Sequence, residues 1–586
     1  MKNYITIIIL TALIFSACEG PLDVKPYDKY EAEFVFSVTK KAEEYVLNTY
    51  NVLPYGNSNS NGYNRLDGGN AMIASASDEA MPNMSGSTVT YLTNGSLSST
   101  SPNPDNTWNH NYQYIRAINL GLENLDYMPE VDQELKEQYY GELIFLRAFA
   151  HFELVKRFGG IPIVTRPLNV QEDLAIPRNT FEECIDFIVG ECDLAIQTLL
   201  APEEASGGSL GRISTGAAMA LKSRVLLYAA SPLYNGNGYD GSGNSLICYG
   251  SASPARWEAA ARAAADVINL HYYELFSGTG LADGHTDAQT MSIGEKNYRD
   301  IFYTLAGNNE LILVRTSALS NAVEKKNTPV GYTNGEGTTG PSQQIVDAYG
   351  MVNGKQIGDQ ESGYDPADPY TNRDPRFYAS IFYNGMQWSG RAVETYIGGA
   401  DNATGATNAT KTGYYLSKFM KSDVKIAGSE TNTYHCFPLI RYAEILLNYA
   451  EAMNEAYGPD ADPEGFGKTA RNAVEEVRAR VLRPSDAAVT APAGDKDAMR
   501  EAIRKERRIE LAFEDHRHLD VKRWMIGPET LGQNLQGMRI TKNGDNYSYE
   551  VQSNVSDRVF DAKMYLYPIP QNEINKNKAM EQNPLW

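Results

Sequence analysis

Residues 141–162 read GELIFLRAFAHFELVKRFGGIP, and this stretch decides the kind of fold that the chain can form. Apolar residues recur in it at helical spacing and form one stripe along a helix: Leu143, Leu146, Ala150 and Leu154. The glycines and the proline at 159–162 then end the helix. The stretch therefore predicts a helix that buries one face against the rest of the molecule.

Similar segments follow along the chain. Residues 179–180 (Asn-Thr) offer an N-cap for a helix over 181–200, and 214–215 (Ser-Thr) open an alanine-rich helix. Further helices are predicted over 257–270, 442–453, 468–482 and 496–513. Because small side chains let helices approach closely, we predict a mainly α fold of tetratricopeptide-like helix pairs.

Long irregular segments separate these helices. They are rich in Gly, Ser, Asn and Thr, which bury too little apolar surface to form a core: 57–67, 85–105, 236–253, 277–294 and 398–412. A few short strands are predicted, at 310–315, 377–383 and 392–397. The sequence therefore predicts a helical scaffold that carries a loop-built face.

The N-terminus has the pattern of an export signal. Lys2 precedes an apolar run over 5–15, which is too short to span a bilayer, and Ser-Ala-Cys follows at 16–18. Cysteine after two small residues resembles a bacterial lipobox, so we expect a signal peptide over 1–17, lipid on Cys18 and a polar tether over 18–30. An ordinary signal peptide with an incidental cysteine is the alternative.

Charge and cysteine content narrow the classes of partner. The chain carries 52 basic and 73 acidic side chains, a formal net charge of −21. Proteins that bind nucleic acids or anionic lipid surfaces carry a basic surface patch, so this net charge argues against both ligands. We therefore expect contact with a membrane only through the lipid on Cys18. The other cysteines lack zinc-type spacing and are interpreted as buried, with a pairing of the last two left open: Cys184, Cys192, Cys248 and Cys436.

The charged run over 501–520 is the place where catalysis would be sought. Glu510 and Glu514 share one helix face, as a glycosidase pair could. Arginines at 507, 508 and 517 would lower the pKa of a carboxyl group, whereas a general acid needs a raised pKa. We therefore predict a structural ion-pair network, no catalytic residue, no metal site and no cofactor, with a structural calcium ion left open.

Seven motifs, in order along the chain, resemble those of the SusD/RagB-like lipoproteins of the Bacteroidota. They are RAFAHFELVKRFGGIP (147–162), ALKSRVLLYAASP (220–232), DPRF (374–377), RYAEILLNYAEA (441–452), ERRIELAFE with HR (506–517), LYPIPQ (566–571) and QNP (582–584). Each motif alone is weak, but the ordered set is specific and spans the body of the chain.

This resemblance implies a SusD-like body over 31–586: helical parts at 31–235 and 436–586, and a loop-rich insertion at 236–435 that forms part of a binding face. It implies an outer-membrane lipoprotein that faces the cell exterior and passes oligosaccharides to a SusC-like, TonB-dependent transporter. RagB-type members handle peptides, so a peptide ligand is the alternative, and a glycoside hydrolase on the same scaffold is the second.

Aromatic residues in loops are the candidate ligand contacts, because sugar rings stack on aromatic faces while their hydroxyls need polar partners. The chain holds 38 tyrosines, most of them on helical stripes, and Trp108 opens a predicted helix and is expected in the core. The loop candidates are Tyr63, Asn64, Arg65, Tyr91, Asn94, Tyr332 and Trp388. For each aromatic candidate, a buried ring that pins its loop is the alternative.

Overall fold

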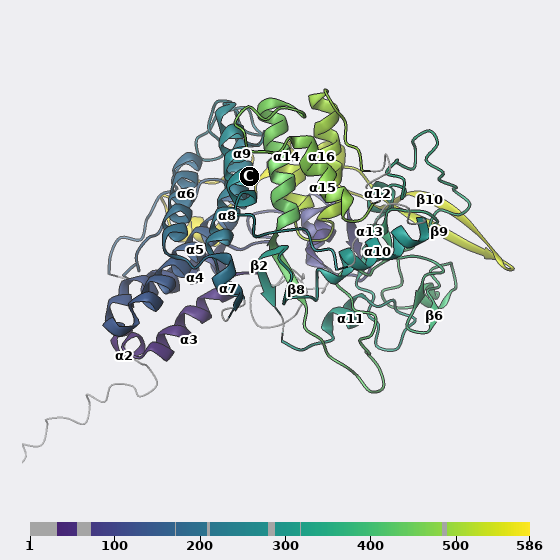
Figure 1. The fold of residues 1–586 in the computed structure, drawn as a ribbon, viewed down its shortest axis with the longest axis horizontal. Helices are drawn as coiled ribbons and strands as arrows, with labels where there is room; N and C mark the ends of the chain where they lie inside the picture. Colours follow the sequence, from purple (N-terminus) through teal and green to yellow (C-terminus); the bar gives the residue numbers. More distant parts are fainter. Residues whose placement is uncertain are drawn as a thin grey trace, which may run out of the picture.

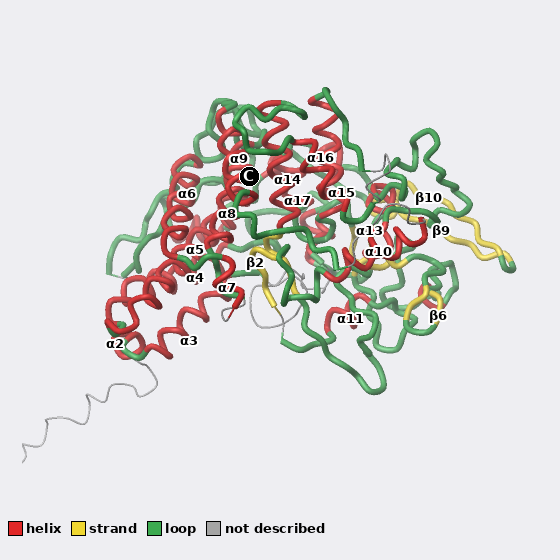
Figure 2. Tube along the Cα trace, viewed as in Figure 1, coloured by secondary structure: helices red, strands yellow, loops and turns green. Residues whose placement is uncertain are grey.

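The computed structural model describes residues 32–54, 72–169, 171–207, 211–278, 287–316, 318–482 and 489–586. Helices dominate this part of the chain, and most strands are short, so the predicted mainly α fold is confirmed (Figures 1 and 2). The predicted signal peptide and the whole tether lie outside the described residues, as do four candidate residues: Cys18, Tyr63, Asn64 and Arg65.

The long helices pack one after another. Helix α4 (Trp108–Asn124) contacts α5 (Gln133–Phe158), which contacts α6 (Phe181–Thr198), and α6 contacts α8 (Thr215–Ala230). Helix α8 then contacts α9 (Ala255–Ile268). The succession agrees with the predicted helix pairing, while its likeness to a tetratricopeptide stack stays a prediction.

The C-terminal helices extend the same stack. Helix α9 packs against α14 (Tyr442–Tyr457), which also contacts α15 (Ala470–Ala479) and α16 (Lys496–Glu510) (Figure 1). The other α-helices of the described chain are α2 (Ala32–Phe36), α3 (Thr39–Thr49), α7 (Pro202–Gly207), α10 (Asp287–Asp300), α11 (Ala322–Asn327), α12 (Gln343–Ala348), α13 (Pro375–Ser380), α17 (Arg517–Arg523), α18 (Gly527–Thr530) and α19 (Gln571–Lys576). Segments far apart in sequence thus form one helical body.

Helix α5 is the centre of the N-terminal part. Its residues from Gly141 to Val155 are all buried, which marks a helix covered on every side rather than on one stripe. The C-terminal segment helps to cover it, because the backbone N–H of Tyr567 donates to the Arg157 carbonyl at 2.8 Å. Trp108 is 3% exposed at the start of α4, as expected of a core residue.

Within the described ranges, the strands form antiparallel pairs. The pairs are β1 (Ala80–Pro82) with β3 (Thr339–Pro341), β2 (Leu311–Thr316) with β8 (Cys436–Arg441), β4 (Ile381–Phe382) with β7 (Tyr415–Leu416), β5 (Gln387–Trp388) with β6 (Arg391–Ala392), and β9 (Leu535–Asn543) with β10 (Asn546–Ser556). The last pair is a long hairpin that projects from the body (Figure 1).

The strand predictions had mixed outcomes. The strand at 310–315 is confirmed as β2, whereas 377–383 is mostly helix α13 and 392–397 contributes only Ala392 to β6. Helix α13 begins there because the Asp374 carboxylate accepts the Arg376 N–H at 2.9 Å and Pro375 occupies the first turn. The predicted loop at 277–294 is also wrong from Asp287 on, where α10 begins.

The described chain contains no helix that is long and apolar enough to cross a membrane. The cysteines Cys184, Cys192, Cys248 and Cys436 are buried free thiols, so Cys248 and Cys436 do not pair. Burial raises the pKa of Cys436 to about 12, which keeps this thiol protonated and unreactive at neutral pH.

Candidate functional site

The charged run at 501–520 forms a buried ion-pair network. Arg441 donates to Glu310 and Glu510, both at 2.6 Å, and to Glu514 at 2.7 Å. All four side chains are at most 1% exposed. The network is confirmed, but its partners differ from those expected: Arg507 pairs with Asp520, and Arg508 and Arg517 pair with Asp78.

This network does not prepare a carboxyl group for acid catalysis. Burial alone would raise the pKa of Glu510, yet the adjacent arginines Arg480, Arg441 and Arg376 outweigh it and hold that pKa well below its usual range. A glycosidase acid needs the opposite shift. Glu510 therefore stabilises the junction of α14 and α16 as an ionised partner.

Burial raises the pKa of three carboxyl groups among the described residues: Glu79, Glu142 and Asp347. Burial, together with the neighbouring Asp78, raises the pKa of Glu79 to about 8, and Oε1 of Glu79 has no hydrogen-bond partner among the described residues. The adjoining cavity is about 10 Å³, which holds about one water molecule and no sugar. Glu79 thus lies beyond the reach of a saccharide.

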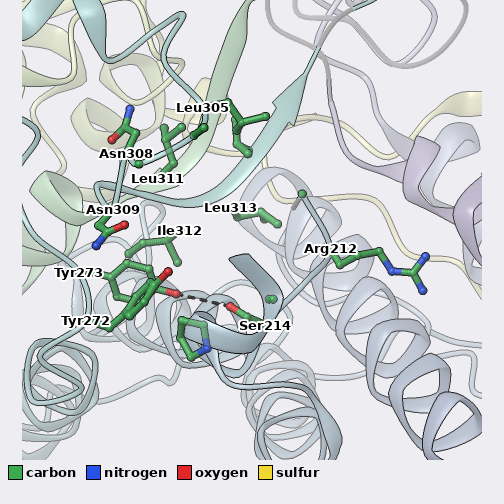
Figure 3. A pocket seen from close by; sticks show the side chains of 16 residues that line it. Arg212, Ser214, Tyr272, Tyr273, Leu305, Asn308, Asn309, Leu311, Ile312 and Leu313 are labelled. Carbon is green, nitrogen blue, oxygen red and sulfur yellow. Dashed lines mark hydrogen bonds between the residues drawn. The ribbon is translucent and has the colours of Figure 1, made fainter. Parts of the chain in front are cut away.

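A groove beside α8 and α9 contains two cavities that share one wall. The first, of about 260 Å³, is lined by residues of α7, the segment before α8, and β2 (Figure 3). The second, of about 620 Å³, lies between the end of α9 and the segment before α15. We call this the α9 groove, and its shared wall consists of Tyr272, Tyr273 and Asn309.

Local packing fixes the two rings of the wall. Tyr273 is 7% exposed, and its hydroxyl lies 3.5 Å from the Ser214 hydroxyl. Gly216 makes room for this ring, since a Cβ there would lie 2.7 Å from the ring carbon Cε2. The half-buried Tyr272 ring meets Tyr273 edge-on, with 5.2 Å between ring centroids. The buried ring therefore holds the accessible ring in place.

The polar groups of the groove differ in their bonding. Asn308 is used by the fold, because its amide donates to the carbonyls of Ile301 and Thr304 at 3.2 and 2.9 Å. The half-buried side chain of Asn309 forms no hydrogen bond with described residues. In Figure 3, Asn309 lies beside the two tyrosines, and Arg212 points away from them. Arg212 pairs with Glu142 at 2.9 Å.

This wall combines the groups that a sugar needs. A tyrosine ring offers an apolar face, and an unbonded amide offers both a donor and an acceptor for hydroxyl groups. Sequence reasoning missed Tyr272 and Asn309, because they lie on separate segments that only the fold brings together. The Tyr-Tyr pair just after a helical pattern was the one local signal.

Two of the predicted loop residues lie together elsewhere. The Tyr332 hydroxyl donates to the Trp388 carbonyl at 3.0 Å, and the Arg391 guanidinium covers the Tyr332 ring at 3.6 Å from its centroid. Arg391 in turn pairs with Asp401 at 2.7 Å. Trp388 is 8% exposed and packs edge-on against Phe382. These rings pin neighbouring loops, and Tyr332 keeps only part of its surface accessible.

The remaining predicted pair lies in another segment. Tyr91 is half-buried in a single 3-10 turn, Thr88–Leu92. The Asn94 side chain accepts the backbone N–H of Ser96 at 3.0 Å, as in an Asx turn. Among the described residues, no hydrogen bond or ring contact joins this pair to Tyr332 or Trp388.

Comparison with known proteins identifies the family. Residues 308–586 match the model of the SusD family, and residues 22–227 match a family described as starch-binding and associating with the outer membrane. The chain belongs to the SusD family. The resemblance drawn from the seven motifs is thereby confirmed.

Known SusD-like proteins match nearly the whole chain. SusD-like protein P38 of Formosa agariphila is 24% identical over 562 residues, which cover 90% of this chain and 92% of the relative. The crystal structure of a SusD-like protein from Bacteroides fragilis matches with a TM-score of 0.74 at 28% identity, covering 94% of this chain and 98% of that one.

A further structure supports the fold alone. It is a SusD-like carbohydrate binding protein from Bacteroides fragilis, 22% identical, with a TM-score of 0.72 over 93% of this chain and all of that one. The agreement extends over nearly all of the chain, so the architecture described above is that of the SusD-like structures.

Proposed function

We propose that this SusD-family chain is a non-catalytic surface lipoprotein that binds oligosaccharides and hands them to a TonB-dependent outer-membrane transporter. One observation carries the binding part: in the α9 groove, the half-buried Tyr272 ring and the unbonded Asn309 amide line the same two cavities. A stacking face beside a free hydrogen-bonding group is the minimum that recognition of a pyranose requires.

The family gives this proposal its ligand class and its place in the cell. One matching family is described as starch-binding and associating with the outer membrane, and one similar structure is named a carbohydrate binding protein. In this proposal Cys18 carries the lipid, the tether over 18–30 spaces the body from the membrane, and the SusC-like transporter lies beneath it. Tyr63, Asn64, Arg65, Tyr91, Asn94, Tyr332 and Trp388 stay candidate contacts on the loop-built face.

Calorimetric titration against a panel of oligosaccharides and peptides tests the ligand class. We expect oligosaccharide binding, and Tyr272→Ala should weaken it by about 2- to 10-fold, the share of one ring contact, with little change in the unfolding temperature. Tyr127→Ala is the matched control, because Tyr127 is 48% exposed and lies outside the groove. Binding of peptides alone would replace the glycan with the RagB-type alternative.

The same panel tests the absence of catalysis. The ionised, arginine-bound Glu510 supports a structural role, so we expect no product from any glycan of the panel. Product that forms with the wild-type chain and disappears in Glu510→Gln would replace the proposal with the hydrolase alternative.

Lipid attachment has its own test. Metabolic labelling with a fatty acid should mark the wild-type chain and not Cys18→Ser, and protease added to intact cells should reach the body. An unlabelled wild-type chain would contradict the anchor, and a protected body would contradict the outward orientation.

A further inference from the structure

The hairpin β9–β10 carries a tyrosine face that the α9 groove does not use. Tyr547 lies opposite Lys542, and Tyr549 lies opposite Ile540. Because side chains two residues apart share a face of a strand, the two tyrosines point to the same side. The hairpin projects at the end of the molecule away from α9 (Figure 1).

These rings continue into a row that joins the hairpin to the body. Ring centroids lie 5.7 Å apart for Tyr396 and Tyr547, 6.5 Å for Tyr547 and Tyr549, and 5.4 Å for Tyr549 and Tyr370. Exposure rises along the row, from 6% at Tyr370 to 37% at Tyr547. We call Tyr370, Tyr549, Tyr547 and Tyr396 the hairpin row: its inner end is core and its outer end meets solvent.

The base of the hairpin is fixed, so the row is held in place. Met538 and Ile540 are 5% and 1% exposed. The Ile540 carbonyl accepts the backbone N–H of Ile397 at 2.9 Å, and the Met538 N–H donates to the Thr412 carbonyl at 2.8 Å. A preorganised aromatic surface loses little conformational entropy when it binds a ligand.

A basic group completes the outer end of the row. The Lys542 amine lies 5.0 Å from the centroid of Tyr396 and 5.9 Å from that of Tyr547, and it forms no salt bridge with described residues. The amine hydrogen-bonds the Tyr396 side chain, and its other N–H donors are available to hydroxyl or carboxylate oxygens. Half-exposed rings beside an accessible donor thus repeat the chemistry of the α9 groove on the projecting hairpin.

We propose that the outer end of the hairpin row, Tyr396 and Tyr547 with Lys542, is a second binding surface that holds the extended chain of a polysaccharide. This inference rests on the proposed function and adds the ligand's size: a polymer contacts both surfaces, whereas a short oligosaccharide fills only the groove. Two linked contacts raise the apparent affinity without any new contact in the groove.

Affinity electrophoresis and calorimetry can separate the two surfaces. The probes are amylopectin, xylan, galactomannan, pectin and alginate, each paired with a short oligosaccharide of the same polymer. For a polymer that the wild-type chain binds, Tyr547→Ala should weaken binding about 3- to 10-fold, while the matching oligosaccharide binds as before. Ser548→Ala is the control, because Ser548 lies on the opposite face of the same strand.

The outcomes distinguish this surface from the proposed function. Unchanged polymer affinity in Tyr547→Ala overturns the second surface and leaves the groove intact. An equal loss for polymer and oligosaccharide overturns the second surface and also contradicts the groove, because it places the short oligosaccharide on the hairpin. Failure of the wild-type chain to bind any of the ten probes overturns both. Circular dichroism and the unfolding temperature confirm that each variant is folded.

Discussion

The interior between α14 and α16 and the α9 groove both contain polar side chains, but those side chains are bonded in opposite ways. In the interior, Arg441 donates to three buried carboxylates. In the groove, the Asn309 amide forms no hydrogen bond with described residues. The polar groups that hold this interior are buried and bonded, whereas the amide that can serve a ligand is accessible and unbonded.

The largest effect should come from breaking the interior. Arg441→Met leaves the carboxylates of Glu310, Glu510 and Glu514 buried with fewer partners, and removing one member of a buried ion pair costs about 3–5 kcal/mol. Urea unfolding measures this loss. Lys576→Ala, which breaks the exposed pair with Glu573, should change stability by less than about 1 kcal/mol. Equal losses in both variants would contradict the structural role of the interior.

A smaller loss is expected where the fold supports the groove. In Gly216→Ala, the new Cβ collides with the Tyr273 ring, and overpacking of this kind costs about 1–3 kcal/mol. Oligosaccharide affinity should fall together with stability, since Tyr273 holds Tyr272. Gly190→Ala is the matched control, because a Cβ there meets nothing within 4 Å. A stable Gly216→Ala variant with normal affinity would refute this coupling.

The pH dependence of stability should reveal Glu79. Burial raises the pKa of Glu79 in the folded state to about 8, above the usual value of about 4.3. The stabilisation that the protonated Glu79 gives the folded state is therefore complete below about pH 4.3 and is lost as the pH rises to about 8. Arginine-bound carboxylates with lowered pKa values, such as Glu510, change the stability with pH only at more acidic pH, where they become protonated. Between about pH 4.3 and about pH 8, the titration of Glu79 should therefore lower the free energy of unfolding by up to about 1.4 kcal/mol per pH unit.

Glu79→Gln removes this titration and should flatten the fall between pH 5 and 8, as measured by urea unfolding at several pH values. An identical slope in the wild-type chain and the variant would show that Glu79 is ionised in the folded state. Asp347→Asn is the comparison variant. Burial also raises the pKa of Asp347, but this side chain is only half-buried, whereas Glu79 is fully buried.

The smallest effect distinguishes two adjacent asparagines. Asn309→Ala should weaken oligosaccharide binding by about 2- to 10-fold, the effect of losing one hydrogen bond, and should leave the unfolding temperature unchanged. Asn308→Ala should do the reverse, because that amide bonds Ile301 and Thr304. Calorimetry and thermal unfolding of both variants provide the check, and matching behaviour of the two would remove Asn309 from the site.

Local rules were enough to predict the helical scaffold. The Thr180 N-cap is present as a capping box with Glu183, and α8 begins at Thr215 as expected. Helix α13 was misread as a strand because its aromatic residues outweighed the Asp374-Pro375 start signal. The β9–β10 hairpin was missed although Gly544-Asp545 forms its two-residue turn, with glycine at the first central position. The apolar pattern of α5 also understated its burial, because its coverings come from distant segments.

The site was less predictable than the scaffold. Loop position selected Tyr332 and Trp388, but only the fold shows that Arg391 covers one ring and that the other is buried. Tyr272 and Asn309 were missed because they come together only where the segment after α9 meets the segment before β2, as in the bond from the Glu274 N–H to the Asn309 carbonyl at 3.4 Å. No local pattern encodes this contact. The availability of a polar group is a property of tertiary structure.

The most direct test of the central claim is a crystal structure of the protein with the oligosaccharide that binds best in the titration panel. The account predicts a sugar ring on Tyr272 in the α9 groove, with a hydroxyl bonded to the Asn309 amide. A well-ordered oligosaccharide bound elsewhere, with the groove left unchanged, would contradict it.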